Sequence, residues 1–482
     1  MIQTNPFDDD KLREECGIFG IIGTKDAGAH AALGLHALQH RGQEAAGIVA
    51  FDGQQFHSHR AMGQVGDNFG AESVIARLRG HAAIGHVRYS TTGETILRNV
   101  QPLFAEFAFG GFAVGHNGNL TNAHGIRTEL IRRGAIFQST TDTEVIVHLM
   151  AKAEGDVVER LIAALRHVEG AYSLVCIARD KVIGVRDPLG VRPLVLGELE
   201  GADILASESC ALDIIGARYV RDIEPGEMVV LDGKRITSLR PFPKLKQRFC
   251  VFEYIYFARP DSIMEGQSVY DARKRIGAEL ARESHVPADV IIPVPDSGVP
   301  AALGYSQEAK VPFELGIIRN HYVGRTFIEP TDHIRHLGVK LKHNANRVHI
   351  EGRRIILVDD SIVRGTTSKK IVEMMRQAGA KEVHMRISSP PTMHSCFYGI
   401  DTPQPDKLLA HRFNVAGMAQ FIGVDSLAFI SMDGLYRAMG HPGRDAAAPK
   451  FCDACFSGEY PTRLTDLEDG AAPTQLPLLE IA

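Results

Sequence analysis

The chain has 482 residues, a net charge of -5, and 44% hydrophobic and 23% charged side chains. This is the composition of a globular protein with about two to four domains of roughly 150 residues each. No apolar run reaches the roughly 18 residues that span a bilayer, and residues 1–15 lack the apolar core of an export signal. Mild acidity gives no global electrostatic footprint for nucleic acid. We therefore expect a cytoplasmic protein that acts on small molecules, with neither a membrane nor a nucleic acid as partner.

The first half of the chain combines strand and helix patterns. Short apolar runs bounded by Gly, Asn, Asp and His predict strands, as at 16–23, 84–87 and 112–114. Helical periodicity predicts helices at 29–38, 128–133 and 144–153. An α+β domain is therefore predicted over 16–240. The Pro- and Lys/Arg-containing segment 238–248 breaks both periodicities and predicts the connection to the next domain.

The second half alternates continuous apolar strands with amphipathic helices. Strands are predicted at 290–294, 354–358 and 383–387, and helices at 271–283 and 368–378. Continuous apolar strands joined by helices are typical of a parallel sheet covered on both faces, so we predict an α/β domain over 250–460. The remaining residues, 461–482, predict a C-terminal tail that is loosely ordered from about Asp466.

A polar loop follows the second of these apolar strands. The strand ends in Asp359-Asp360, and Gly365-Thr366-Thr367 then precede a helix. A loop between a strand and a helix N-terminus offers unpaired N–H groups and a positive dipole end, which together bind anions. A simple capping turn would explain the hydroxyls but not two adjacent acids. Carboxylates at this edge of a parallel sheet suit sugar hydroxyls and Mg²⁺ beside a phosphate.

Residues 355–367, IILVDDSIVRGTT, resemble the phosphoribosylpyrophosphate motif of type I phosphoribosyltransferases. The resemblance implies that Asp359 and Asp360 contact the ribose hydroxyls. It implies that the 5-phosphate is held by the loop residues Arg364, Gly365, Thr366 and Thr367.

Two other segments extend this resemblance. Residues 291–298, IIPVPDSG, resemble the pyrophosphate loop of the family, which implies that Ser297 joins Asp359 and Asp360 at the Mg²⁺ site. The basic segment 319–347 resembles the flexible loop that closes over the substrate and implies that Arg325 binds phosphoribosylpyrophosphate.

That basic segment also allows a second interpretation, since a solvated basic loop would have the same composition. Residues 319–321 and 411–414 do not follow the expected consensus. The difference concerns loop dynamics and nucleotide sensitivity rather than the reaction.

Cys16 opens an apolar run, where an isolated cysteine is usually a core residue. Two segments, GHVRYST at 85–91 and GHNGNL at 115–120, are nevertheless turn-rich and crowded with hydrogen-bonding groups. With QHRGQE at 39–44, they resemble the glutaminase domain of N-terminal-nucleophile amidotransferases, which has an αββα fold. The two resemblances together cover nearly the whole chain from residue 16 to about 461, with the domains in the order that the family has.

The resemblance implies a leader, residues 1–15, that is removed autocatalytically. Cys16 would then carry a free α-amine, whose pKa of about 7.7 to 8.0 lets it act as base for the thiol. The Asn117 side chain and the Gly118 N–H would stabilise the oxyanion.

The same resemblance predicts the glutamine-binding residues. Arg88 matches the clamp for the glutamine α-carboxylate, a role suited to a planar bidentate donor. Asp142 matches the anchor for the α-ammonium group, and Arg41 and Gly42 belong to the same pocket. Simpler interpretations exist: a surface ion pair for Arg88, a tight turn for Asn117-Gly118 and a helix cap for Asp142.

Cysteines near the end of the chain form a Cys-x-x-Cys pair, Cys452 and Cys455, with Cys250 and Cys396 in the same half. Their spacing alone is compatible with zinc, iron–sulfur or redox use. The resemblance to the iron–sulfur, leader-processed branch of the family implies that all four bind a [4Fe-4S] cluster. The other two cysteines are predicted to be core residues: Cys176 and Cys210.

The implied activity is that of a glycosyltransferase which uses glutamine. Glutamine, phosphoribosylpyrophosphate and water would give 5-phosphoribosylamine, glutamate and pyrophosphate, the entry step of purine synthesis. Ammonia would pass internally from Cys16 to the sugar. The resemblance also implies Mg²⁺, feedback inhibition by purine nucleotides, with the choice between AMP and GMP left open, and a homotetramer or other homo-oligomer.

Two rival functions remain. One is another N-terminal-nucleophile amidotransferase, against which the phosphoribosylpyrophosphate motif argues. The other is a non-catalytic nucleotide sensor on a phosphoribosyltransferase fold, which any turnover would exclude.

Overall fold

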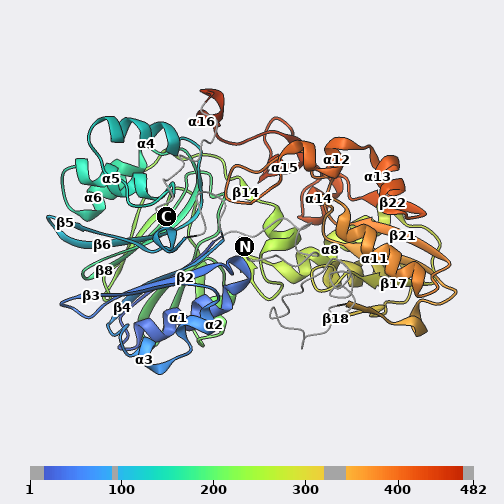
Figure 1. Ribbon diagram of the computed structural model, residues 1–482, viewed down its shortest axis with the longest axis horizontal. Helices are drawn as coiled ribbons and strands as arrows, with labels where there is room; N and C mark the ends of the chain where they lie inside the picture. Colours follow the sequence, from blue (N-terminus) through green and yellow to red (C-terminus); the bar gives the residue numbers. More distant parts are fainter. Residues whose placement is uncertain (1–15, 90–95, 320–342, 471–482) are drawn as a thin grey trace, which may run out of the picture.

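The computed structural model describes residues 16–89, 96–319 and 343–470. These residues form two domains that lie side by side (Figure 1). The first domain ends with strand β13 (Ile236–Leu239), and the second begins with β14 (Phe249–Cys250). Between them, residues 240–248 contain neither helix nor strand, as the proline-containing linker predicts.

The first domain contains two antiparallel sheets stacked on each other. The seven-stranded sheet has the order β11 (Arg218–Asp222), β9 (Val195–Leu199), β10 (Ala202–Ala206), β1 (Gly17–Ile22), β4 (Ala82–Arg88), β2 (Ala45–Phe51) and β3 (Phe56–Met62). The six-stranded sheet has the order β13, β12 (Met228–Leu231), β8 (Lys181–Arg186), β7 (Gly170–Ala178), β6 (Gly110–Leu120) and β5 (Leu103–Phe107).

Helices cover the outer face of each sheet (Figure 1). One set is α1 (Ala27–Ala37), α2 (Val65–Phe69), α3 (Glu72–Ile75) and α7 (Cys210–Asp213); the other is α4 (Ala123–Arg132), α5 (Glu144–Lys152) and α6 (Val157–Leu165). Strand β1 shows why four layers form: Ile18 and Ile22 pack between the sheets, whereas Phe19 and Ile21 pack against helix α1. This period of two buries both faces of the strand. The predicted αββα fold is confirmed.

Residues 85–89 and 115–120 are not turn-rich, contrary to the sequence interpretation, and residues 90 and 91 lie outside the described residues. Residues 85–88 belong to β4, which is paired on both sides with β1 and β2. Residues 115–120 belong to β6, where they pair with β7. The ladder hydrogen bonds satisfy the backbone, so the polar side chains of these strands are not needed to pair it.

The second domain is built on a parallel four-stranded sheet in the order β17 (Val290–Pro293), β20 (Arg354–Asp359), β21 (Glu382–Ile387) and β22 (Ser426–Phe429). On β20, Ile356 and Val358 pack on the side of α8 (Val269–Ser284), α9 (Val299–Ala309) and α14 (Met432–Ala438). Ile355 and Leu357 pack on the side of α11 (Thr366–Gln377) and α13 (Val415–Ile422). The predicted α/β domain is confirmed.

Shorter elements complete the two domains. They are β15 (Ile263–Met264), β16 (Gln267–Ser268), β18 (Ile317–Arg319), β19 (His343–Ala345), β23 (Phe451–Cys452), α12 (Leu409–Arg412), α15 (Ala454–Ser457), α16 (Thr465–Glu468), a π-helix (Glu253–Phe257) and 3₁₀ turns at Gln39–Arg41, Leu97–Asn99, Arg347–His349 and Pro405–Lys407.

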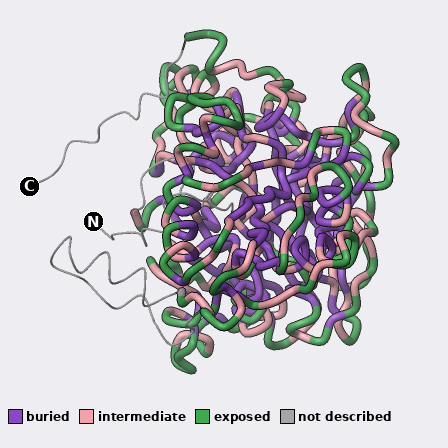
Figure 2. The backbone as a smooth tube through the Cα atoms, turned by 90° about the vertical axis from the view of Figure 1, so that its right-hand side faces the viewer, coloured by how far each residue is buried: buried purple, intermediate pink, exposed green. Residues whose placement is uncertain are grey.

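The two domains share a buried apolar cluster, and Figure 2 shows buried residues concentrated in the interior of the molecule. Strand β14, which opens the second domain, pairs in parallel with β23, near the end of the chain. Residues of the first domain, including Leu189 and Val191, belong to the same apolar cluster as the second domain's Phe249 and Val251. The joint between the domains is therefore a packed core and not a solvated hinge.

The C-terminal segment differs from the predicted loose tail. Helix α16 returns to the first domain, where Asp466 accepts hydrogen bonds from the N–H groups of His124 (2.8 Å) and Gly125 (2.9 Å). These donors lie in the first turn of α4, which has unpaired N–H groups and a positive dipole end. The acid at 466, which breaks the sequence pattern, thus orders the segment. Residues 471–482 lie outside the described residues.

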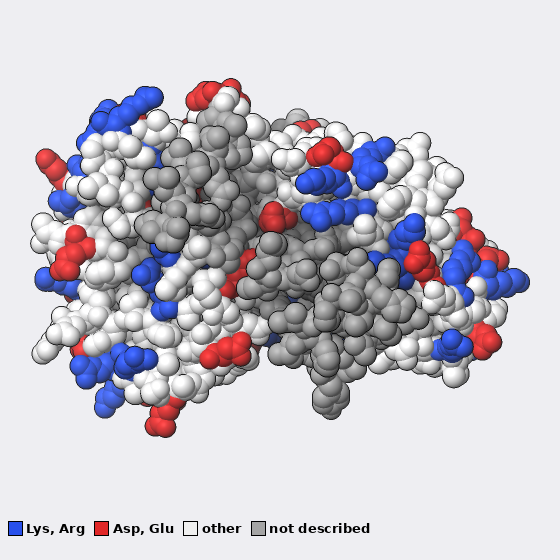
Figure 3. Space-filling view, in the orientation of Figure 1, with Lys and Arg blue, Asp and Glu red and all other residues white. Residues whose placement is uncertain are grey.

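Acidic and basic side chains are interspersed on the face shown in Figure 3, outside the grey residues. Over the described ranges, none of the helices combines the length and the apolar character that crossing a bilayer requires.

Candidate active sites

Cys16 lies directly before β1, at the end of the central strand of the first sheet. Its Sγ is 3.6 Å from the carbonyl oxygen of Tyr89, the residue that follows β4. Burial raises the pKa of the Cys16 thiol above its ordinary value, while the positive charge of Arg88 opposes the rise. The thiol therefore stays protonated near neutral pH and needs a base to become a nucleophile.

Arg88 and Asp142 place opposite charges around this thiol, since both change its pKa. Arg88 is only 3% exposed, which excludes a surface ion pair, and its Nη1 donates to the carbonyl of Asn99 (2.7 Å). The Asp142 carboxylate accepts the N–H of Leu120 (2.9 Å) and of Thr143 (2.7 Å). An α-amino acid, with one carboxylate and one ammonium group, matches this pair of charges.

The electrostatics of Asp142 favour its ionised form. Burial alone would raise its pKa, but nearby His116 and the two backbone N–H donors outweigh burial and hold the pKa below its ordinary value. Helix α5 begins at Glu144 with Thr143 as its N-terminal cap, so the simple cap role for Asp142 is wrong.

Asn117 and Gly118 lie inside strand β6, so the tight-turn interpretation is wrong as well. The Asn117 side chain is 0% exposed, and neither its Nδ2 nor its Oδ1 has a hydrogen-bond partner in the described part of the chain. An unpartnered buried amide is costly and indicates a ligand. Gly118 has φ +138°, and a Cβ there would lie 2.0 Å from the carbonyl oxygen of Ala171. Only glycine fits this position.

The Arg41–Gly42 turn closes the same region. A Cβ at Gly42 would lie 2.7 Å from the backbone nitrogen of Arg88, so this turn packs against the end of β4. The Arg41 guanidinium is directed to two carboxylates, those of Glu208 (2.6 Å) and Glu253 (2.7 Å). Direct glutamine binding by Arg41 and Gly42 stays a prediction.

A second polar site lies at the carboxyl edge of the parallel sheet. Asp359 ends β20, and both Asp359 and Asp360 are buried. The Asp360 carboxylate accepts the hydroxyl hydrogens of Ser361 (2.7 Å) and of Ser297. Ser297 belongs to the loop after β17, so two loops from different strands meet at this edge. Oxygen donors gathered in this way form a set that Mg²⁺ prefers.

The loop from Ser361 to Gly365 leads into helix α11. Gly365 has φ +77° and forms the helix N-cap without a capping side chain. Thr366 and Thr367 occupy the first turn, Thr367 being buried and Thr366 exposed. Arg364 is half-buried beside them. The N–H groups of this first turn can bind a phosphate, as the sequence predicts.

Sequence reasoning missed a third loop at this edge. Ser388 and Thr392 follow β21, and the Ser388 hydroxyl donates to the carbonyl of Asp359 (3.1 Å). The hydroxyls of Ser389 and Thr392 are buried and lack hydrogen-bond partners among the described residues. The signal was present, because SSPPT directly follows a predicted parallel strand whose carboxyl end must lie beside that of β20.

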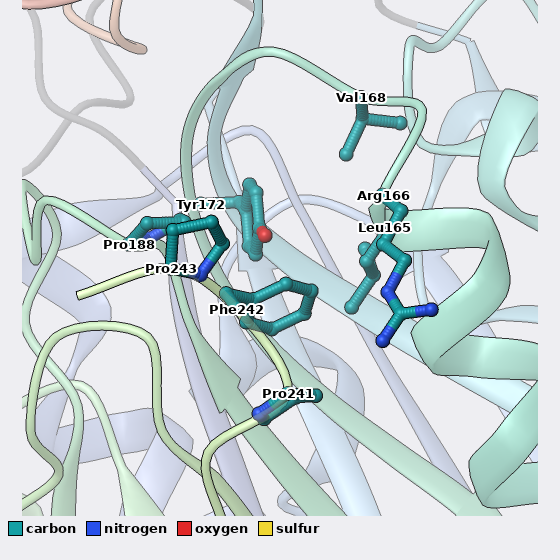
Figure 4. A pocket seen from close by; sticks show the side chains of 8 residues that line it. All are labelled: Leu165, Arg166, Val168, Tyr172, Pro188, Pro241, Phe242 and Pro243. Carbon is teal, nitrogen blue, oxygen red and sulfur yellow. The ribbon is translucent and has the colours of Figure 1, made fainter. Parts of the chain in front are cut away.

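Two sequence predictions concern residues that the structure does not describe. Residues 1–15 and Arg325 lie outside the described residues. A surface pocket, shown in Figure 4, is lined by the linker side chains Pro241, Phe242 and Pro243 together with Tyr172, Pro188, Leu165, Arg166 and Val168. None of the three linker side chains can act as acid, base or nucleophile, and we assign this pocket no chemistry.

Comparison with known proteins identifies both domains. Residues 86–213 match a glutamine amidotransferase domain, and residues 261–388 match a phosphoribosyl transferase domain. An amidophosphoribosyltransferase from Rhizobium etli is 57% identical, over 98% of this chain and 97% of the relative. An amidophosphoribosyltransferase from Bacillus subtilis is 46% identical, over 94% and 95%.

The chain belongs to the amidophosphoribosyltransferase family. A solved structure, glutamine phosphoribosylpyrophosphate amidotransferase from Bacillus subtilis complexed with ADP and GMP, has a TM-score of 0.88 at 45% identity and covers 93% of this chain and 98% of that one. The amidophosphoribosyltransferase fold therefore extends through both domains.

Four cysteines of this amidophosphoribosyltransferase-family chain lie at the joint between the domains. Cys250 and Cys452 are directly paired on β14 and β23. The carbonyl of Cys455 accepts the N–H groups of Met393 and His394, both at 3.0 Å, just before Cys396. The pairing and these hydrogen bonds bring four distant positions together. Cys176 and Cys210, by contrast, are buried in apolar clusters, as predicted.

The donor set fits an iron–sulfur cluster. Three of the four cysteines are buried, and Cys396 is half-buried with its Sγ accepting the N–H of Tyr398 (3.3 Å). Thiolates and N–H···S bonds are what such clusters require. Among the described residues, no three His, Cys, Asp or Glu side chains are gathered closely enough to bind a metal as they stand.

Proposed function

We propose that the two sites of this chain act in sequence, with ammonia released at Cys16 consumed at the Asp359–Asp360 edge. The overall activity is that of the family: glutamine-dependent formation of 5-phosphoribosylamine, the first step of purine biosynthesis. Glutamine, phosphoribosylpyrophosphate and water give 5-phosphoribosylamine, glutamate and pyrophosphate. The proposal assigns the residues and the order of events.

In the glutamine half-reaction, Cys16 is the nucleophile and its α-amine, freed by removal of residues 1–15, is the base. The thiolate attacks the side-chain amide carbon, and the Asn117 Nδ2 and Gly118 N–H stabilise the oxyanion. Ammonia leaves from the tetrahedral intermediate, and water then hydrolyses the thioester to glutamate. Arg88 and Asp142 hold the α-carboxylate and the α-ammonium group. The unpartnered amide of Asn117 supports this assignment.

In the sugar half-reaction, Asp359 and Asp360 hold the ribose hydroxyls, and the α11 N-terminus with Thr366 and Thr367 holds the 5-phosphate. Ammonia attacks C1 as the bond to pyrophosphate breaks. Passage within the protein keeps ammonia unprotonated, and therefore nucleophilic. Arg325 would close over the substrate.

Two inorganic groups belong to this proposal. Asp359, Asp360 and Ser297 would hold Mg²⁺, which neutralises the charge of the departing pyrophosphate. Cys250, Cys396, Cys452 and Cys455 would hold a [4Fe-4S] cluster, whose bonds link β14, β23 and the Cys396 segment.

Regulation and assembly are also proposed. The Bacillus subtilis relative was solved with ADP and GMP, which supports binding of purine nucleotides by this chain as well. We further propose that the protein is cytoplasmic and forms a homotetramer or another homo-oligomer. Light scattering on a sizing column would show a mass of about four chains if the tetramer is correct.

The decisive experiment measures both products together. Anaerobically purified protein is given glutamine and Mg²⁺, with or without phosphoribosylpyrophosphate, and glutamate and pyrophosphate are quantified. Equal amounts, appearing only with both substrates, support coupled sites. Glutamate without pyrophosphate would contradict the coupling, and a Cys16→Ala variant that still hydrolyses glutamine would contradict the assigned nucleophile.

A further inference from the structure

A carboxylate of the second domain, Glu253, lies buried against two arginines of the first. Its Oε1 accepts from Arg41 Nη2 (2.7 Å) and Arg192 Nη1 (3.1 Å), and its Oε2 accepts from Arg41 Nη1 (3.0 Å). The side chains of Glu253, Arg41 and Arg192 are at most 1% exposed. Glu253 begins the π-helix that directly follows the first strand of the second domain.

Both arginines also reach the glutamine site. The Nε–H of Arg41 donates to the carbonyl oxygen of Cys16 (3.4 Å), the residue proposed as nucleophile. The Nε–H of Arg192 donates to the carbonyl oxygen of Tyr398 (3.0 Å). Glu253 is thus connected to the Cys16 backbone through Arg41, and to the 397–399 segment through Arg192.

The 397–399 segment packs directly on the oxyanion strand. The Asn119 side chain donates to the carbonyl of Phe397 (3.0 Å). A Cβ built on Gly399 would lie 3.0 Å from the Cα of Gly118, so the two backbones are in close contact. A shift of the 397–399 segment would therefore displace the Gly118 N–H, the second proposed oxyanion donor.

The ion pair between Arg41 and Glu253 fixes the direction of the Arg41 side chain. Arg41 binds Glu253 through both terminal nitrogens, and this fork-to-fork arrangement fixes the plane of the guanidinium and hence the direction of its Nε–H. Glu208 binds the same guanidinium at 2.6 Å, so the charge of Arg41 stays partly balanced when Glu253 is neutralised. Glu253 binds both arginines and so contributes to the orientation of each.

We propose that Glu253 is a positioning residue for glutamine hydrolysis. Through Arg41 it sets the position of the Cys16 backbone, and through Arg192 it sets the position of the segment that supports Gly118. The first domain therefore completes its glutamine site only when the second domain is docked on it. This inference rests on the proposed role of Cys16 as the nucleophile.

The test compares Glu253→Gln with a matched variant, Glu227→Gln. Glu227 is also fully buried and also binds an arginine, Arg221, through two bonds (2.7 and 2.8 Å), but both residues belong to the first domain. For each variant we would measure glutamine-dependent and ammonia-dependent synthesis of phosphoribosylamine, kcat and KM for glutamine, and the melting temperature. External ammonia bypasses Cys16 and serves as the internal control.

We expect Glu253→Gln to lower the glutamine-dependent kcat about 10- to 100-fold, the loss that a misplaced reacting group causes. KM for glutamine and the ammonia-dependent rate should change less than about 3-fold, because the substrate contacts and the sugar site stay intact. Glu227→Gln should keep both rates. Equal loss of the two activities, or equal loss in both variants, would show a purely structural role and overturn the proposal.

A double-mutant cycle tests whether Glu253 acts through Arg41. If Glu253 acts through Arg41, the kcat losses of Arg41→Met and Glu253→Gln should not multiply in the double variant. Multiplicative losses would overturn the proposal. Cys16→Ala separates the two hypotheses: glutamine hydrolysis that survives this change refutes the nucleophile, whereas its loss with a normal Glu253→Gln enzyme refutes only the positioning role.

Discussion

At the scale of single residues, the role proposed for the Asn117 amide can be tested directly by substitution. Asn117→Ala should lower glutamine-dependent kcat about 100- to 1000-fold, because one preorganised oxyanion donor is lost. Ammonia-dependent synthesis should be unchanged. The control is Asn122→Ala, whose side chain hydrogen-bonds the backbone of His167 and Glu169. Loss of ammonia-dependent activity in Asn117→Ala would argue for misfolding instead.

The pH dependence of glutamine hydrolysis tests the base. Burial raises the pKa of the Cys16 thiol, so the rate depends on the neutral α-amine, whose fraction rises with pH. The rate should therefore rise with pH and level off above about 8, since the α-amine pKa is about 7.7 to 8.0. Burial lowers the pKa of His86 to about 3, so titration of His86 does not change the rate near neutral pH. A rate still rising above pH 9 would indicate direct ionisation of the thiol.

Functional residues could be predicted from the sequence where they belong to a recognisable motif, and not elsewhere. Asp359, Asp360 and Asn117 stand in recognisable sequence motifs. Glu253 was not found, although a single acid inside the apolar run FCVFEYIYF is itself a signal, because a buried carboxylate needs cationic partners. Its partners come from residues about 60 and 210 positions away, and sequence spacing does not show such pairs.

At the scale of elements, the loop between β17 and α9 must lie tightly against β20. A Cβ at Gly298 would stand 2.4 Å from the carbonyl oxygen of Val358. Gly298→Ala should therefore push the loop away, cost about 1 to 3 kcal/mol of unfolding free energy and raise KM for phosphoribosylpyrophosphate. Thermal melting and initial rates would measure both effects. Gly66→Ala, where a Cβ meets nothing within 4 Å, is the control and should leave KM unchanged.

Element prediction succeeded where periodicity was strong. The predicted helix 271–283 is α8, and the predicted strand 354–358 is β20, each within two residues at its ends. Helix α6 was missed although its Asp156 and Glu159 form a capping box, a signal readable from the sequence. The middle of β4 and the start of β6 were predicted as strands, at 84–87 and 112–114, but residues 115–120 of β6 were taken for a turn-rich segment because their polar side chains and glycines obscure the alternation of a strand.

At the scale of the whole molecule, the four cysteines proposed to hold the cluster come from distant parts of the chain. Cys455→Ser should abolish the visible absorbance of a [4Fe-4S] cluster and lower iron and sulfide from about four per chain. It should also lower the melting temperature, because the cluster bonds join the ends of the second domain. Cys176→Ser, at a buried cysteine in the core of the first domain, should destabilise the protein without loss of colour. A colourless wild-type protein that contains zinc would contradict the cluster.

The return of the chain through Asp466 has a mechanical consequence. The first domain is joined to the second once through residues 240–248 and again through α16, which Asp466 fastens to the start of α4. A body tethered at one point can swing in any direction, whereas a body tethered at two points can turn only about the line through them. The packed core that the two domains share opposes the remaining rotation as well.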